Sequence, residues 1–266
     1  MNFVPSGVIT LTTDFGHKGP FVATMKGMML GRYPGARIID LTHEILVHWP
    51  AEAGFWLERS FRYFPKGTAH VAVVDPGVGT ERDIIAFELE GHIFMAPDNG
   101  LLGGLANLPG RGPVHRVDFD RLAQLGLSTP SATFHGRDVF APLIAEIAAG
   151  RRQVAELGPT KSDLVPSWVE EASAEGARVR GVVITIDNFG NLISNIPRSL
   201  VERFKRPVVE VSGHHLPFLR TYGDVKPGDY LTLINSFEVL EIARAEQSAA
   251  EALGAGRGAP VWVNEA

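Results

Sequence analysis

The chain has 266 residues, of which 45% are hydrophobic, so it can bury a core in one large domain or two modest ones. The absence of cysteine excludes a disulfide scaffold, a thiolate nucleophile, a Cys-ligated zinc site and an iron–sulfur cluster. A net charge of -5 without a Lys/Arg cluster argues against a nucleic-acid partner, and no apolar stretch reaches the roughly 20 residues of a membrane span. The N-terminus lacks the basic region of a signal peptide, so we expect a soluble cytoplasmic protein without a membrane partner.

The first half of the sequence alternates short β-rich runs with helical patterns. Strands are expected at residues 8–12, 36–41, 71–74, 83–89 and 92–96, and helices from Pro20, over 50–63 and over 138–149. Because strands that alternate with helices form βαβ units, we expect an α/β domain with a mainly parallel sheet over residues 1–165.

The second half of the sequence lacks this alternation of strands and helices. Periodicity is lost over residues 151–175, which is typical of a crossing between domains. Short strands separated by turn residues follow, at 178–186, 192–196, 207–211, 230–234, 239–243 and 260–263. We therefore expect a smaller all-β domain, a barrel or a sandwich, over residues 166–266, with a flexible loop at 249–260.

Polar residues follow four of the strands expected in the first domain: Asp14, His43, Asp75, and the pair Asp98 and Asn99. In an open α/β sheet, ligands bind in the crevice beyond the carboxyl ends of the strands. Any one of these residues is more often a helix cap or a turn residue. The set together predicts a ligand site at that edge of the sheet.

The run DPGVGTER, from Asp75 to Arg82, carries the strongest local pattern. Its glycines allow a tight bend, and Arg82 is close enough in sequence to return toward Asp75. The lysine of the phosphate-binding loop GxxxxGK[ST] is missing, which excludes a nucleoside triphosphatase of that type.

His135, in TFHGRD, stands just before an expected helix. The positive potential of a helix N-terminus lowers the pKa of a histidine, and a neutral imidazole can accept or relay a proton near pH 7. The alternative is a capping turn in which Asp138 satisfies the helix amides and His135 only packs. The remaining candidates for metal ligands, His43, His48, His214 and His215, match no zinc-binding spacing.

Two segments of the second domain combine polar and aromatic residues. DNFGN, residues 187–191, suits a hairpin turn, but Phe189 could also stack on a base while the amide of Asn191 binds an adenine edge. The run Asn235-Ser236-Phe237 offers similar chemistry, with a hydroxyl suited to a carboxylate.

Six motifs occur in the order TDFG (residues 13–16), VVDPGVGTxR (73–82), APDNGLL (96–102), TFHGRD (133–138), DNFGN (187–191) and NSFxxLEIA (235–243). This series resembles the S-adenosyl-L-methionine (SAM) hydroxide adenosyltransferases, which are related to fluorinases and chlorinases. The resemblance implies hydrolysis of SAM to adenosine and L-methionine, with SAM as substrate and no cofactor or metal. It also implies a homotrimer whose sites lie between the N-terminal domain of one subunit and the C-terminal domain of its neighbour.

The resemblance also implies roles for individual residues. Asp75, Arg82 and His135 match the residues that activate water, and Asp14 matches the carboxylate that holds the ribose hydroxyls. The remaining matches form the substrate-binding set: Asp187 near the methionine ammonium, Ser236 near the methionine carboxylate, Phe189, Asn191 and Tyr222 around the adenine, and Asn235 beside Ser236.

The chemistry of the reaction favours these residue types. The sulfonium of SAM is already a good leaving group, so the reaction needs a nucleophile in line with the C5′–S bond. Water is a poor nucleophile unless a carboxylate or an imidazole takes its proton, and Arg82 could stabilise a developing hydroxide. Which of these groups accepts the proton is left open by the sequence.

The chain departs from the family pattern at one position and from the halogenase pattern at another. Glu238 stands where the family usually has glycine, which puts the bend beside Ser236 in question, and halogenases have tyrosine at the position of Asp75. A halide-dependent, chlorinase-like reaction is therefore disfavoured by Asp75 and His135. Two competing hypotheses from different classes are a non-catalytic SAM or adenosine sensor and a metal-dependent hydrolase.

Overall fold

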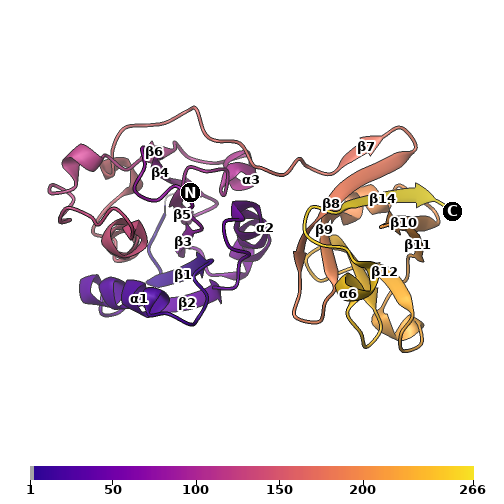
Figure 1. Ribbon diagram of the computed structural model, residues 1–266. Helices are drawn as coiled ribbons and strands as arrows, with labels where there is room; N and C mark the ends of the chain where they lie inside the picture. The colour runs from indigo at the N-terminus through magenta and orange to yellow at the C-terminus, as the bar shows by residue number, and fades with distance from the viewer. Residues whose placement is uncertain (1–2) are drawn as a thin grey trace. The chain divides into compact units, whose positions relative to one another are not determined.

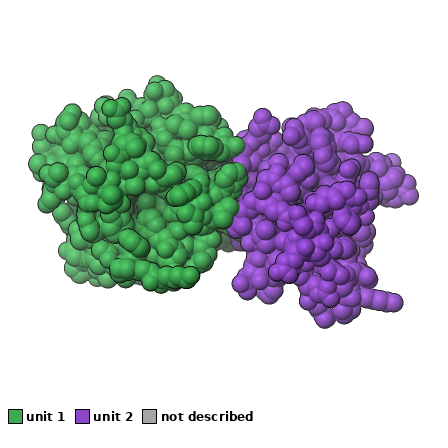
Figure 2. Space-filling model, in the orientation of Figure 1, with its two compact units in different colours: residues 1–168 green, residues 169–266 purple. Residues whose placement is uncertain are grey.

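A computed structural model describes residues 3–266 of the chain, which divides into two compact units, residues 1–168 and 169–266 (Figure 1, Figure 2). The division falls inside the segment 151–175, where the sequence loses its periodicity. Within residues 3–266, no helix is long and apolar enough to cross a membrane.

The first unit contains a six-stranded sheet in the order β2-β1-β3-β5-β4-β6. Its strands are β1 (Val8–Thr13), β2 (Arg37–Thr42), β3 (Ala69–Val73), β4 (Ile84–Leu89), β5 (His92–Pro97) and β6 (His115–Arg116). The strands β2, β1, β3 and β5 are parallel, whereas β4 pairs antiparallel with β5 through a turn at Glu90-Gly91. The predicted α/β unit with a mainly parallel sheet is confirmed.

Helices cover both faces of this sheet. They are α1 (Phe21–Arg32), α2 (Pro50–Ser60), α3 (Gly103–Ala106) and α4 (Ala141–Ala148), with one-turn helices η1 (Phe61–Tyr63), η2 (Phe119–Arg121) and η4 (Val154–Glu156) and a π-helical turn η3 (Gly136–Phe140). Successive strand residues face opposite sides, so Val71 packs in the core with α1 and α4, whereas Ala72 packs in the core with α2 and α3.

The second unit is an antiparallel sheet in the order β11-β10-β14-β8-β9-β13-β12, with β7 paired to β8. Its strands are β7 (Ser173–Glu175), β8 (Arg178–Ile186), β9 (Leu192–Pro197), β10 (Pro207–Val211), β11 (His214–Pro217), β12 (Tyr230–Ile234), β13 (Val239–Arg244) and β14 (Pro260–Glu265). The sheet nearly closes on itself, because Thr232 in β12 accepts a 2.8 Å hydrogen bond from Leu219, just after β11. The predicted all-β unit is thus confirmed as a barrel-like sheet.

Three short helices lie in the connections between these strands: α5 (Arg198–Val201), η5 (Tyr222–Asp224) and α6 (Ala249–Leu253). The expectation of a flexible loop over 249–260 is wrong for its first residues. Ser248 caps α6 by accepting a hydrogen bond from the Glu251 amide, and Gly254 ends the helix in the left-handed conformation. Ala249 and Leu253 are buried in the barrel core, which stabilises a helix too short to form alone.

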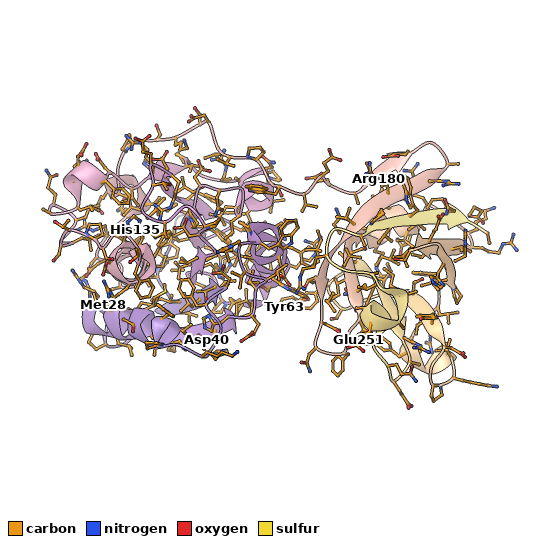
Figure 3. The ribbon with its side chains drawn as sticks, viewed as in Figure 1. Met28, Asp40, Tyr63, His135, Arg180 and Glu251 are labelled. Atoms are coloured by element: carbon orange, nitrogen blue, oxygen red, sulfur yellow. The ribbon has the colours of Figure 1, made fainter. Side chains whose placement is uncertain are left out.

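Two of the buried histidines of the first unit, His70 and His92, contact each other; Figure 3 shows the side chains of the molecule. His70 hydrogen-bonds to Thr10 Oγ1 through Nδ1 (2.7 Å) and to His92 Nδ1 through Nε2 (3.2 Å), and its ring stacks on Phe94. Burial, and then the nearby His92, lowers the pKa of His70 to about 3, and burial also lowers the pKa of His92. The two nitrogens that face each other cannot both carry protons, and the low pKa of His70 keeps that ring neutral in the folded chain.

This pair predicts loss of stability in mild acid. The folded chain keeps His70 neutral while the unfolded chain protonates it below about pH 6.5, so the unfolding free energy falls as the pH drops. In urea titrations from pH 7 to pH 5, we expect the unfolding free energy of wild type to fall by roughly 2 kcal/mol more than that of His70→Phe, which lacks the titrating group. A difference that does not change with pH would contradict a neutral His70.

Candidate active site

The residues that follow the parallel strands of the first unit lie at one edge of its sheet, as the sequence predicts. Asp14 follows β1, His43 follows β2, Asp75 follows β3, and Asp98 and Asn99 follow β5. Only part of this set is available for a ligand, because several members are engaged within the fold.

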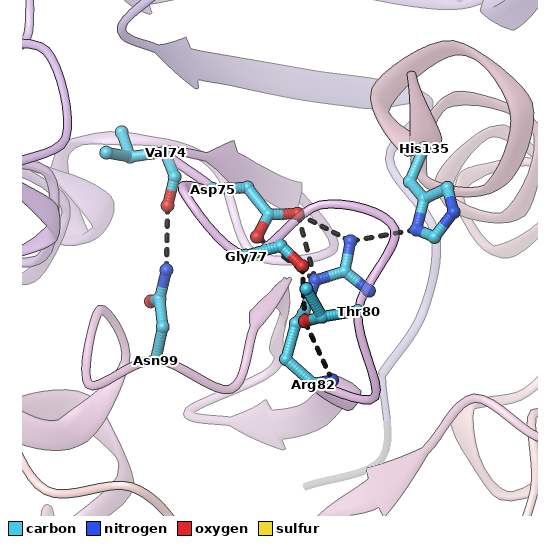
Figure 4. Close-up of polar contacts among 7 residues, drawn as sticks. All are labelled: Val74, Asp75, Gly77, Thr80, Arg82, Asn99 and His135. Carbon is cyan, nitrogen blue, oxygen red and sulfur yellow. Dashed lines mark hydrogen bonds and ion pairs between the residues drawn. The ribbon is translucent and has the colours of Figure 1, made fainter. Parts of the chain in front are cut away.

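His43, Asp98 and Asn99 are held by neighbouring groups of the first unit. His43 is buried between Thr13 Oγ1 (2.8 Å) and Asp40 Oδ1 (3.0 Å). Asp98 accepts a hydrogen bond from the Val165 amide, and the amide of Asn99 donates to the carbonyl of Val74 (Figure 4). These three residues therefore stabilise the loops around the edge, and the expectation that they belong to the site is not supported by their contacts.

The loop that carries Asp75 is pressed against the segment that carries His135. Gly79 has a φ of +78°, and a Cβ at this position would lie 2.1 Å from the carbonyl oxygen of Ala132. Only glycine fits such an approach. Thr80 closes the bend by donating its hydroxyl to the carbonyl of Gly77 (2.7 Å).

Arg82 joins Asp75 to His135 (Figure 4). Its Nε donates to both carboxylate oxygens of Asp75 (3.0 Å each), and its Nη2 donates to Asp75 Oδ2 (2.5 Å) and lies 2.9 Å from His135 Nδ1. The side chains of Arg82 and Asp75 are only 10% and 5% exposed, so the ion pair is shielded from water. The expected return of Arg82 toward Asp75 is confirmed.

These contacts fix the tautomer of His135. A guanidinium has only donors, so Nδ1 of His135 accepts the hydrogen bond and the proton of the neutral ring resides on Nε2. The pKa of His135 is lowered, as expected, but burial is the largest cause and the charge of Arg82 the next, rather than the potential of a helix N-terminus. The residue precedes a π-helical turn that continues into α4, where the sequence predicts one regular helix.

A cavity of about 260 Å³ opens beside these groups. Asp75 and His135 line it with a mainly apolar wall: Phe15, Phe21, Val73, Val78, Thr133, Phe134 and Gly136. Asp14 immediately precedes Phe15 and accepts a hydrogen bond from the His48 amide (3.0 Å). The first unit therefore places a carboxylate and an imidazole at the wall of a small apolar cavity.

The turn at 187–191 of the second unit is held by one carboxylate. Asp187 Oδ1 accepts hydrogen bonds from the amides of Phe189 and Asn191, and Oδ2 accepts one from Asn191 Nδ2 (3.0 Å). Gly190 has a φ of +83°, and a Cβ there would lie 2.3 Å from Ser248 Oγ. This turn leaves Phe189 77% exposed.

A larger cavity, of about 750 Å³, lies beside that turn. Four of the predicted binding residues line it: Asp187, Phe189, Asn191 and Tyr222. Asn235 and Ser236 are not part of its wall. Asn235 is connected to it through Glu241, which accepts hydrogen bonds from Tyr222 Oη (2.5 Å) and from Asn235 Nδ2 (3.2 Å).

Sequence reasoning assigns no role to Glu241, which is only 3% exposed. In the sequence, Glu241 is a single carboxylate inside the apolar run Val239–Ala243. That pattern is typical both of a buried functional carboxylate and of a strand with one solvent-facing position, so it does not distinguish them. Burial raises the pKa of Glu241 and also raises the pKa of Tyr222 above its usual value.

The turn beside Ser236 keeps its bend although Glu238 replaces the usual glycine. Glu238 adopts a φ of +61°, the left-handed conformation that glycine takes without strain. Asn235 closes the turn, since its Oδ1 accepts from the amides of Phe237 (2.9 Å) and Val239 (3.4 Å). The Glu238 carboxylate forms an ion pair with Arg198. Ser236 is exposed at this turn.

Residues 9–158 match the SAM hydroxide adenosyltransferase N-terminal domain, and residues 181–262 match the C-terminal domain of the same family. A protein of Thermus thermophilus named (R)-S-adenosyl-L-methionine hydrolase is 38% identical over 94% of this chain and 96% of its own. One of the same name from Methanocaldococcus jannaschii is 34% identical over 92% and 91%. A fluorinase of Actinoplanes sp. is 27% identical over 89% and 90%.

Solved structures have the same fold. A conserved protein of Thermotoga maritima matches with a TM-score of 0.88 and 31% identity, over 97% of this chain and 100% of that chain. A conserved protein of Thermus thermophilus matches with a TM-score of 0.77 and 33% identity, over 99% and 100%.

The conformation of Glu238 leads to a stability prediction. Glu238→Gly removes both the backbone strain and the ion pair with Arg198, whereas Glu238→Ala removes the ion pair and keeps the strain. We expect the Gly variant to unfold at a higher denaturant concentration than the Ala variant. Equal midpoints would show that the left-handed conformation costs nothing at this position.

Proposed function

This chain belongs to the SAM hydroxide adenosyltransferase family, and we propose that it hydrolyses SAM to adenosine and L-methionine by attack of water at C5′. The observation that carries the proposal is the Asp75–Arg82–His135 arrangement at the wall of an apolar cavity. The curated names of the hydrolases at 34–38% identity support the same reaction.

The tautomer of His135 supports Asp75 as the proton acceptor. Nδ1 of His135 is occupied by Arg82, and Nε2 carries the proton, so the imidazole has no free lone pair for a proton of water. Asp75 keeps unshared lone pairs and becomes the general base, while the His135 Nε2–H donates to the oxygen of the nucleophile. Arg82 holds the base and stabilises the negative charge that develops on that oxygen.

The bonds of the proposed reaction balance without a cofactor. The water oxygen forms a bond to C5′ as the C5′–S bond breaks, and that bond's electron pair neutralises the sulfonium. The proton passes to Asp75 and then to solvent. The mainly apolar wall lowers the polarity around Asp75 and His135, which strengthens their electrostatic contacts. In-line attack predicts inversion at C5′.

The remaining predicted residues provide the proposed substrate contacts. Asp14 would hold the ribose hydroxyls, and Phe189, Asn191 and Tyr222 would enclose the adenine, as their shared cavity in the second unit supports. Asp187 would lie near the methionine ammonium and Ser236 near the methionine carboxylate, with Asn235 in the same turn as a further substrate-binding residue.

We further propose a homotrimer in which the N-terminal unit of one copy and the C-terminal unit of its neighbour complete each site. This assembly fits the division of the predicted residues, because the two units each carry a different part of the set.

The lack of cysteine fits the reducing environment of the cytoplasm, which is the proposed location.

Turnover of SAM in oxygen-18 water tests the reaction. We expect one labelled oxygen in the 5′-hydroxyl of adenosine and none in methionine, because water attacks carbon. A parallel reaction with chloride is expected to give no 5′-chloro-5′-deoxyadenosine. Unlabelled adenosine would contradict water attack, and a chlorinated product would indicate the halide reaction. Binding without any turnover would indicate a sensor.

Asp75→Asn tests the assignment of the base. The amide retains the size of the carboxylate but cannot accept the proton, so we expect kcat to fall about 10²- to 10⁴-fold. Adenosine binding and the sedimentation coefficient should be unchanged. Asp83→Asn is the matched control, because the neighbouring Asp83 pairs with Lys161 (3.1 Å) and lies outside the cavity wall. Normal turnover by Asp75→Asn would rule Asp75 out as the base.

A further inference from the structure

Glu241 is a buried carboxylate that the proposed reaction does not use. It lies in β13, and its cross-strand neighbours are the buried residues Leu233 of β12 and Ile193 of β9; Ala243, the next residue of β13 on the same face, is buried too. A carboxylate in such apolar surroundings is costly unless hydrogen bonds compensate for the lost water. Its presence there calls for specific partners.

Both partners of Glu241 belong to the proposed binding surface. Oε1 accepts from the hydroxyl of Tyr222, which lies in η5, and Oε2 accepts from Nδ2 of Asn235, which opens the turn that carries Ser236. One carboxylate thus joins two loops that are separate in the sequence. Glu241 itself does not line the 750 Å³ cavity, whereas Tyr222 does.

Local hydrogen bonds close the backbone of both loops. In η5, the Thr221 and Asp224 side chains form a capping box. In the second turn, Asn235 Oδ1 holds the amides of Phe237 and Val239. The bonds to Glu241 therefore fix side chains whose backbone is already closed by local contacts. Tyr222 is 47% exposed, so few packing contacts hold its ring in place. The hydrogen bond of its hydroxyl to Glu241 fixes the ring instead.

We propose that Glu241 is a positioning residue for the nucleoside: it anchors Tyr222 in the orientation that stacks on the base and links that ring to the turn bearing Ser236. The inference rests on the proposed function, because it takes adenosine as part of the ligand. Anchoring the ring before binding lowers the entropy lost when the nucleoside arrives. Glu241 therefore contributes to affinity without touching the ligand.

Two substitutions separate geometry from charge. Glu241→Gln can accept from Asn235 through its oxygen and donate to Tyr222 through its amide, so it keeps both bonds and removes the charge. Glu241→Leu has a similar size, suits the apolar surroundings and removes both bonds. In calorimetric titrations of the full-length protein with adenosine, we expect Leu to weaken binding at least tenfold and Gln less than threefold.

Tyr222→Phe provides a second readout that does not alter the strand. It keeps the ring and removes the anchored hydroxyl, so we expect weaker adenosine binding, and the double variant with Glu241→Leu should bind no more weakly than Glu241→Leu alone. With SAM, KM should rise while kcat changes little. Glu210→Leu, in β10 of the same sheet, is the matched control and should bind like wild type.

The outcomes distinguish the two claims. Wild-type affinity in both Glu241→Leu and Tyr222→Phe would overturn the positioning role, and an equal loss in Leu and Gln would show that charge acts instead of geometry. If Glu241→Leu fails to fold, Tyr222→Phe alone decides the matter. A wild-type protein that neither binds adenosine nor cleaves SAM would refute the proposed function itself.

Discussion

The arrangement of the first unit's site depends on the shared hydrogen bonds of Arg82. One guanidinium donates to Asp75 and to His135, two side chains that come from different loops. Because a guanidinium cannot accept, it dictates which imidazole nitrogen is unprotonated, and this supports the proposal of Asp75 as the base. The pair is shielded from water, so loss of Arg82 would leave an uncompensated carboxylate at the cavity wall.

The second unit uses carboxylates as acceptors to organise its loops. Asp187 closes its own turn, and Glu241 gathers Tyr222 and Asn235. Within residues 3–266, neither Asp187 nor Glu241 forms an ion pair with lysine or arginine, and their mutual repulsion adds to the raised pKa of Glu241. Asp187 lines the larger cavity and Glu241 lies behind its wall, so the two carboxylates act through the loops that they hold.

The sequence was informative where a residue's role follows from local pattern. Strands alternating with helices predicted the parallel sheet, and the spacing of Asp75 and Arg82 predicted their contact. It was not informative where tertiary packing decides. Asp98 and His43 look like site residues in sequence, but Lys161 and Val165 hold the first and Thr13 and Asp40 hold the second. Glu241 could not be assigned because its burial depends on β9 and β12, and the short helix α6 forms only because the barrel core buries Ala249 and Leu253.

The protonation of His135 tests the central claim most directly. Long-range proton–nitrogen correlation spectra of the ¹⁵N-labelled protein at pH 7, with a His135→Gln variant to assign the signals, report which ring nitrogen carries hydrogen. The account predicts a bare Nδ1 and a protonated Nε2. A proton on Nδ1, or a doubly protonated ring, would contradict the shared hydrogen bonding of Arg82 and the choice of Asp75 as the base.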